Sequence, residues 1–294
     1  MQNDDFIITA ISQKGNLVGY FTSIKNCATQ VQAAHRMNNV STAVFARALT
    51  ASILLSGNLK NPDDRLAMTW DCNGPVKKLC IETDGAGNIR GFIEDSQLEF
   101  IERSVQDGEF STEPYIGFGE LTVSRETGNS APYQSIVVIE TGEIAQDLSL
   151  FLEQSLQIQS AVNIALSVDK NNKILCAGGL MLMGLPGVTE QEIKNMYEEF
   201  QKITNLTDIL CKDEQAIFEM FNSLDMDIIG TKSIQFNCKC SSDKVKNVLK
   251  SLKPENLQEF LSENNCYETS CKYCGAQYKI TKEELDGYFF KRNL

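Results

Sequence analysis

Short apolar stretches separated by turn residues dominate residues 1–184 of the chain. Residues 6–12 and 17–22 predict a hairpin, because the turn-forming pair Gly15-Asn16 lies between them. The other stretches with a strand pattern are 65–72, 76–82, 89–92, 120–124, 134–140, 158–168 and 173–181. Most of these follow one another without an intervening helix, so we expect an antiparallel sheet in a mixed α+β domain rather than a doubly wound parallel sheet.

Three segments in the same region predict helices: 26–37, 41–56 and 144–154. In the second, Ser41 is a suitable N-cap and Gly57 a suitable stop. Because this helix is rich in Ala and Leu, we expect it to be buried.

The glycine-rich stretch 84–91 has some likeness to a phosphate-binding loop. It lacks a third glycine at the required spacing, and no convincing helix follows it. We therefore predict that it forms a hairpin turn.

Residues 188–230 differ in character, because apolar stripes at helical spacing lie among charged residues. A capping box, Thr189-Glu-Gln-Glu192, predicts the start of the first helix. The stripes consist of Ile193, Met196, Tyr197, Phe200 and Ile203, then Ile217, Met220, Phe221 and Leu224. With 10 acidic and 3 basic residues, the segment is an acidic amphipathic connector whose apolar face should pack on the large domain. A permanently packed connector is the simpler interpretation, and a releasable one that exposes Met and Phe is the alternative.

Two close cysteine pairs, Cys238-Lys-Cys240 and Cys271-Lys-Tyr-Cys274, mark the last part of the chain. Two such turns facing each other would supply four sulfurs, the donor set of a tetrahedral zinc site. One interpretation is a static zinc staple, since most four-cysteine zinc sites are structural. The other is a thiol switch, because zinc-bound sulfurs are thiolates and thiolates are the oxidisable form.

The tail that carries these cysteines, residues 231–294, is small at 64 residues. Its predicted elements are a strand at 232–236, helices at 242–252 and 254–262, a strand at 278–280 and a capped helix from Thr281. A domain of this size with few large apolar side chains is marginal without a staple. Structural zinc contributes about 10–16 kcal/mol of apparent folding energy, so metal loss should unfold the tail.

The net charge of −12 argues against extensive nucleic-acid binding, which needs clustered Lys and Arg. The tail itself has 11 Lys/Arg and 8 Asp/Glu. A nucleic-acid-binding zinc-ribbon protein is therefore the alternative class, opposed by the acidic remainder and the lack of aromatic–basic interleaving. The lysines that would support it are Lys239, Lys244, Lys246 and Lys250.

The first five residues lack the features of a secretory signal, and the apolar run 174–188 is short and interrupted by glycine. We therefore expect a cytoplasmic protein without a membrane partner. In a reducing compartment the presence of ten cysteines points to metal binding or redox sensing rather than to permanent disulfides. We expect no enzyme activity and no catalytic residues. Four thiolates leave zinc no open position, and Cys271–Cys274 does not lie in a thioredoxin-like α/β context.

Cys266 lies five residues before Cys271 and could enter disulfide exchange, although a bystander role is simpler. The cysteines without ligand spacing are predicted to be small buried apolar residues: Cys27, Cys72, Cys80, Cys176 and Cys211. His35 is the only histidine, so no His-based triad can form, and we predict an ordinary polar residue on a helix.

Several further motifs accompany the cysteine pairs. They are Leu55-Ser-Gly-Asn-Leu-Lys60, Asp64-Arg-Leu66, the stretch 84–91 and Gly178-Gly-Leu-Met181. On these motifs the chain resembles, nearly end to end, the thirty-three-kilodalton chaperonin family of redox-regulated heat-shock holdases. Cys266 lies outside the pattern of that family.

The resemblance implies an ATP-independent chaperone that is idle when reduced, with one Zn²⁺ held by the thiolates of Cys238, Cys240, Cys271 and Cys274. Oxidants would form the disulfides Cys238–Cys240 and Cys271–Cys274 and release the zinc. The linker would then unfold, and a homodimer would hold unfolding client proteins and prevent their aggregation.

The resemblance also implies three parts. Residues 1–184 would form an N-terminal α+β chaperone and dimerisation domain, and 185–230 an amphipathic helical linker. Residues 231–294 would form a small C-terminal four-cysteine zinc-binding switch domain. Clients would bind the linker and part of the large domain.

Overall fold

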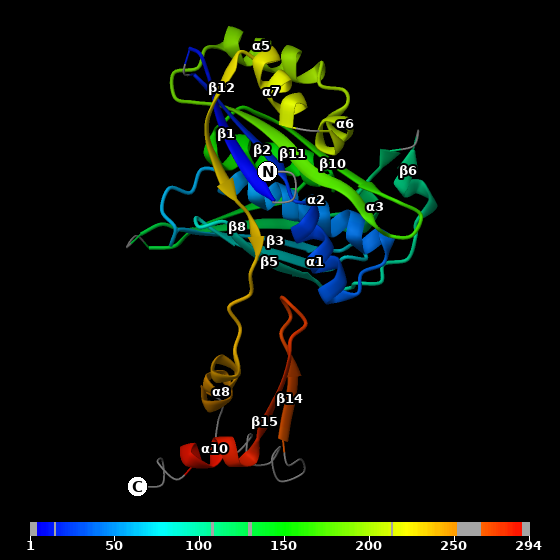
Figure 1. Cartoon of the computed structure of the whole chain (residues 1–294), viewed down its shortest axis with the longest axis vertical. Helices are drawn as coiled ribbons and strands as arrows, with labels where there is room; N and C mark the ends of the chain where they lie inside the picture. The colour runs from blue at the N-terminus through cyan, green and yellow to red at the C-terminus, as the bar shows by residue number, and fades with distance from the viewer. Residues whose placement is uncertain are drawn as a thin grey trace. The chain divides into compact units, whose positions relative to one another are not determined.

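The computed structural model of the chain describes residues 5–14, 16–106, 109–128, 131–212, 214–251 and 266–289. The chain divides into two compact units, Met1–Phe236 and Asn237–Leu294 (Figure 1). The larger is built of antiparallel sheets and helices, so the predicted α+β class is confirmed.

A five-stranded sheet forms one layer of the larger unit. Each neighbouring pair is antiparallel, and β1 and β2 form the predicted hairpin, although Gly15 in its turn lies outside the described residues. The strand order is β10 (Ser160–Val168), β11 (Ile174–Gly184), β2 (Leu17–Ser23), β1 (Phe6–Ser12) and β12 (Met226–Ser233).

A six-stranded sheet forms a second layer, so the predicted strands divide between two sheets. Its order is β13 (Gln235–Phe236), β5 (Asn88–Ile93), β4 (Lys78–Asp84), β3 (Arg65–Cys72), β8 (Gly119–Glu126) and β9 (Tyr133–Ile139). All pairs are antiparallel except β13 with β5. The glycine-rich stretch 84–91 turns between β4 and β5, as predicted, with Gly87 at φ +88°.

Shorter elements lie between β5 and β8. They are a 3₁₀ turn, η1 (Glu102–Ser104), a two-stranded ribbon of β6 (Val105–Gln106) and β7 (Glu109–Phe110), and α3 (Glu113–Ile116).

The helices α1 (Lys25–His35), α2 (Asn39–Ser56) and α4 (Ile144–Leu156) pack between the two sheets (Figure 1). Helix α2 contacts strands of both sheets and is buried almost all round, as its Ala- and Leu-rich sequence predicted. Its length and apolarity would suffice to cross a membrane, but 89% of that stretch is buried inside the protein, as in a core helix.

The predicted N-cap of α2 was wrong. Asn38 is the cap, and its side-chain oxygen accepts a hydrogen bond from the backbone N–H of Ser41 at 2.9 Å. Both residue types cap helices well, and Ser41 instead accepts from the N–H of Leu98 through its hydroxyl.

The opposite face of the five-stranded sheet is covered by α5 (Glu190–Gln201), α6 (Leu206–Cys211) and α7 (Glu214–Ser223). Successive side chains of a strand point to opposite faces. Accordingly Ile7 packs with α1, α2 and α4, whereas Phe6 and Ile8 pack with the apolar stripes of α5–α7. The capping box of Thr189 is present. The expectation that this acidic segment packs on the large domain is therefore confirmed.

The segment after α7 belongs structurally to the larger unit. Strand β12 pairs with β1 and β13 with β5, and the Ile234 N–H donates to the Asp5 carbonyl at 2.8 Å. The boundary between the two compact units therefore lies between residues 236 and 237 of the chain, and the small unit starts six residues after the predicted start of the tail. Strand β12 begins earlier in the chain than the strand predicted at 232–236. The prediction missed its first residues because Asp227 and Gly230 interrupt the apolar pattern.

The small unit contains α8 (Ser242–Ser251), the hairpin of β14 (Cys266–Ser270) and β15 (Gln277–Thr281), and α10 (Lys282–Phe289). The predicted helix at 254–262 lies outside the described residues. Among the described residues of the small unit the apolar core is small, with Leu249, Ile280 and Leu285 buried. So few buried side chains agree with a unit that needs a further source of stability.

Candidate metal centre

Two turns bring the four predicted ligand cysteines together. Cys238 and Cys240 follow directly after β13, whereas Cys271 and Cys274 lie in the turn between β14 and β15. In that turn the N–H of Gly275 donates to the Cys271 carbonyl at 2.8 Å, and Gly275 has a positive φ of 70° that glycine adopts without strain.

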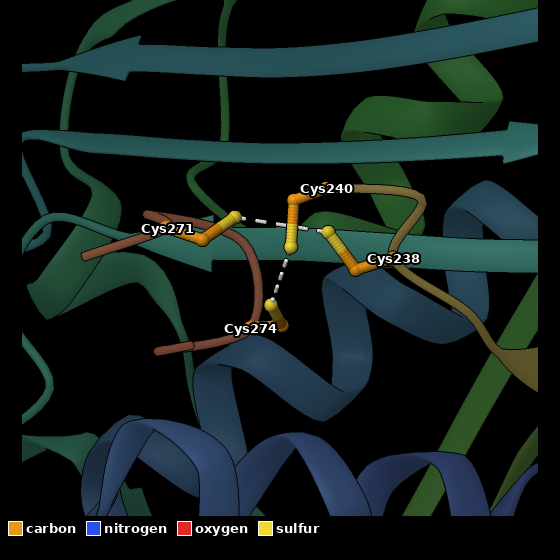
Figure 2. A group of neighbouring side chains, drawn as sticks. All are labelled: Cys238, Cys240, Cys271 and Cys274. Atoms are coloured by element: carbon orange, nitrogen blue, oxygen red, sulfur yellow. Dashed lines mark hydrogen bonds between the residues drawn. The ribbon is translucent and has the colours of Figure 1, made fainter. Parts of the chain in front are cut away.

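The geometry of the sulfurs fits one tetrahedral ion. All four sulfur atoms lie within 4.8 Å of one another, and all four residues are half-buried. Sγ of Cys238 is 3.7 Å from that of Cys271, and Sγ of Cys240 is 3.4 Å from that of Cys274 (Figure 2). Ligands about 2.3 Å from a tetrahedral zinc would lie about 3.8 Å apart. The four-cysteine cluster could therefore hold a metal ion, and none of the four cysteines is in a disulfide.

The electrostatics of the cluster favour a cation. Burial alone would raise the pKa of Cys240, but hydrogen bonds from Tyr278 and the other thiols outweigh it and lower the pKa to about 7. Burial raises the pKa of Cys274 to about 12 and also raises the pKa of Cys271. Sulfurs this close cannot all carry negative charge, because like charges disfavour one another. A bound cation would remove that penalty and stabilise all four thiolates.

The spacing of the cysteines did not reveal one neighbour of the cluster. The hydroxyl of Tyr278, on β15, donates to Sγ of Cys240 at 2.9 Å. Such a donor orients a ligand and stabilises its charged form. Its position four residues after Cys274, in a strand leaving the metal turn, is the only sequence signal that could have indicated it.

Two of the lysines considered for nucleic-acid contact are engaged within the small unit. Lys246 lies 2.7 Å from a carboxylate oxygen of Glu284, and Lys244 donates to the backbone carbonyl of Lys239. Lys279 pairs with Glu268 at 2.8 Å. The positive charge of this unit is thus partly neutralised by its own carboxylates.

The remaining cysteines are not members of the four-cysteine cluster. Cys27, Cys80 and Cys176 are buried as predicted, whereas Cys72 is half-buried. The prediction was wrong for Cys211, which is exposed at the end of the short helix α6. Spacing alone could not show this, because exposure depends on which face of α6 packs on the sheet.

Cys266 and His35 are not members of the cluster either. Cys266 begins β14, and its sulfur lies 3.8 Å from a carboxylate oxygen of Glu268. His35 ends α1, with its ring 6.3 Å from that of Phe45. The expectation of an ordinary helical position for His35 is confirmed.

Comparison with known proteins agrees with this architecture. A model of the Hsp33 protein family matches residues 5–281. The 33 kDa chaperonin of Geobacter sulfurreducens is 29% identical over 286 residues, covering 96% of this chain and 94% of that protein. The 33 kDa chaperonin of Lactobacillus johnsonii is 29% identical over 291 residues, covering 98% and 99% of the two chains.

The fold has a counterpart among solved structures. The crystal structure of the 33 kDa chaperonin, a heat shock protein 33 homolog, from Thermotoga maritima matches with a TM-score of 0.87. It covers 99% of this chain and 100% of that chain at 23% identity.

Fold and site together define a class of two-unit α+β proteins whose small unit has a four-cysteine cluster able to hold a metal ion. Within that class, the chain belongs to the Hsp33 family, and the two relatives compared above are named as chaperonins.

Proposed function

We propose that this protein is a redox-regulated, ATP-independent holdase that binds unfolding proteins and prevents their aggregation under oxidative stress. The observation that carries the proposal is the set of four sulfurs within 4.8 Å of one another, none of them in a disulfide, in a unit whose described residues form only a very small apolar core. Such a unit depends on whatever holds its sulfurs together, so thiol chemistry controls its folding.

In the reduced state, Cys238, Cys240, Cys271 and Cys274 would hold one Zn²⁺ as four thiolates, the donor set that zinc prefers in closed structural sites. Zinc would cross-link the two turns and add about 10–16 kcal/mol of apparent folding energy. Oxidation would join Cys238 to Cys240 and Cys271 to Cys274, within each turn. The two turns would then be unlinked, and the small unit would unfold.

The proposed division of labour follows the chain. Residues 231–294 would be the switch, 185–230 the releasable linker, and 1–184 the chaperone and dimerisation domain. The linker suits this role because its apolar stripes cover one face of the five-stranded sheet. If the linker were released, its apolar stripes and the sheet face beneath them would both be exposed to unfolding clients. A few hundred Å² of exposed apolar area is enough to mark an interaction site. The active form would be a homodimer.

A reducing compartment such as the cytoplasm would keep this switch at rest, because thiols stay reduced there. We expect no enzymatic turnover, since four protein ligands would leave the metal no open position for a substrate.

A peroxide treatment tests the proposal. The reduced, zinc-loaded protein is mildly heated with hydrogen peroxide, while a chromophoric chelator reports released zinc and light scattering reports aggregation of a denaturing reporter protein. We expect four thiols to be lost for each zinc released and reporter aggregation to be suppressed without ATP. Zinc release without any effect on the reporter would refute the proposal.

The matched control is Cys266→Ser. Cys266 belongs to the same unit but lies outside the four-cysteine cluster, so this variant should keep its zinc and its response to peroxide. Cys271→Ser removes one sulfur of the cluster and should lose most of the zinc even when reduced.

A further inference from the structure

A second pair of cysteines meets where the acidic helices lie on the five-stranded sheet. Cys176 is a buried residue of β11, and Cys211 is an exposed residue at the end of α6. Helix α6 packs directly against β11. Cys176 lies on the same face of β11 as Leu180 and Leu182, whose side chains face the helices α5–α7.

Two contacts and one helical spacing place the two thiols near each other. Sγ of Cys176 lies 3.7 Å from the backbone carbonyl oxygen of Thr207. Thr207 and Cys211 are four residues apart in α6, so they share one face of the helix. Next to Cys211, the Leu210 side chain lies against β11, 2.6 Å from where a Cβ on Gly178 would be.

The Cys211 thiol also acts on the pKa of Cys176. Burial, and after it the hydrogen-bonded thiol of Cys211, raise the pKa of Cys176 to about 12. Cys176 is thus a protonated thiol at neutral pH, whereas Cys211 is the one that solvent reaches.

We propose that Cys176 and Cys211 form a disulfide under oxidation, which ties α6 to β11. This disulfide goes beyond the proposed function, because the pair shares no residue with the four-cysteine cluster and its oxidation would have the opposite effect on the linker. Oxidation of the cluster would release the acidic helices, whereas oxidation of this pair would retain α6 on the sheet.

The chemistry balances with a peroxide as the two-electron oxidant. The Cys211 sulfur attacks one peroxide oxygen, so that an S–O bond forms, the O–O bond breaks, and water leaves after taking up the thiol proton. The Cys176 sulfur then attacks the Cys211 sulfur. The S–S bond forms, the S–O bond breaks, and the hydroxyl group leaves as a second water with the proton of Cys176.

The order of events follows from these environments. Because Cys176 is buried and protonated, the second step should be slower than disulfide formation in the half-buried four-cysteine cluster. Brief oxidation should therefore leave α6 without a disulfide to β11, and prolonged oxidation should form that disulfide.

Peptide mapping of the full-length, zinc-loaded protein tests the disulfide. After prolonged peroxide treatment, free thiols are blocked and the protein is digested with trypsin without reduction. The expected product joins peptide 174–194, which contains Cys176, to peptide 203–212, which contains Cys211, and dithiothreitol separates them. Recovery of Cys176 as a free thiol while Cys211 is oxidised to a sulfinic acid would overturn the proposal.

Hydrogen exchange tests the tether itself. In peroxide-treated protein, amides of α6 should exchange about tenfold more slowly in the wild type than in Cys211→Ser, because the cross-link restricts opened states. Cys211 is exposed, so its serine variant should fold. The matched control is Cys72→Ser, on β3 of the other sheet, which should exchange like the wild type. Equal exchange in the wild type and Cys211→Ser would refute the tether, whether or not the four-cysteine cluster acts as a switch.

Discussion

At the scale of single residues, the hydroxyl of Tyr278 is the contact that distinguishes Cys240 from the other thiols of the cluster. Tyr278→Phe removes this donor and keeps the ring. The pKa of Cys240 in metal-free protein should therefore rise above about 7, and its alkylation at neutral pH should slow several-fold. Alkylation rates measured against pH would check this. Tyr267→Phe, on the paired strand β14, is the matched control, and an unchanged profile for Tyr278→Phe would show that the hydroxyl has no influence.

Metal affinity should depend steeply on pH. The thiol of Cys274, with a pKa near 12, must lose its proton to bind metal, and so must Cys271, whose pKa is also raised. Each proton released lowers the affinity about tenfold for every pH unit of acidification. Below about pH 7, Cys240 also takes up a proton, so the slope should increase. Competition with a chromophoric chelator at a series of pH values measures this slope, and a flat profile would mean that thiolates are not the ligands.

The sequence predicted residues well where several act together at a fixed spacing. All four cluster cysteines came from two short motifs that the chain folds into facing turns. Tyr278 and Cys211 were missed or misjudged, because each depends on which neighbour lies across a gap in the fold. A lone tyrosine or cysteine has no spacing that could indicate such a neighbour.

At the scale of elements, helix α7 offers two phenylalanines for a matched comparison. Phe221 is 1% exposed in the core beneath the acidic helices, whereas Phe218 is 51% exposed. Phe221→Ala should lower the free energy of unfolding by about 3–5 kcal/mol. Phe218→Ala should change it by less than about 0.5 kcal/mol.

Urea unfolding followed by the single, buried Trp70 measures the comparison, because this residue reports on the larger unit alone. A hydrophobic dye should also bind the Phe221→Ala variant more strongly, since looser helices expose the sheet face. Equal unfolding energies for the two variants would show that α7 does not cover that face.

Elements were predictable where the apolar pattern has one clear period. The strands of the hairpin β1–β2 lie close to their predicted bounds, and the helix α5 starts at its predicted capping box. The division into two sheets was not predictable, because β11 is apolar on both faces and its alternation does not reveal which side meets which layer. Such a strand needs helices on both sides, which only the tertiary fold supplies.

At the scale of the whole molecule, one continuous segment connects the acidic helices to the four-cysteine cluster. After α7, β12 pairs with β1 and β13 pairs with β5, and only Asn237 separates β13 from Cys238. Met226 at the start of β12 packs in the same core as α5–α7. We infer that unfolding of the small unit loosens β13 and β12 first and the acidic helices next. Each segment is held at its C-terminal end by the segment that follows it in the chain, so the loss of one loosens the segment before it.

Hydrogen exchange on the reduced protein, before and after a strong chelator removes the metal, tests this coupling most directly. The account predicts that amides of 266–289 lose protection first, that amides of 190–236 lose it with them, and that the buried helix α2 keeps its protection. If the small unit stays protected without metal, or if it opens while residues 190–236 exchange as slowly as before, the central claim is contradicted.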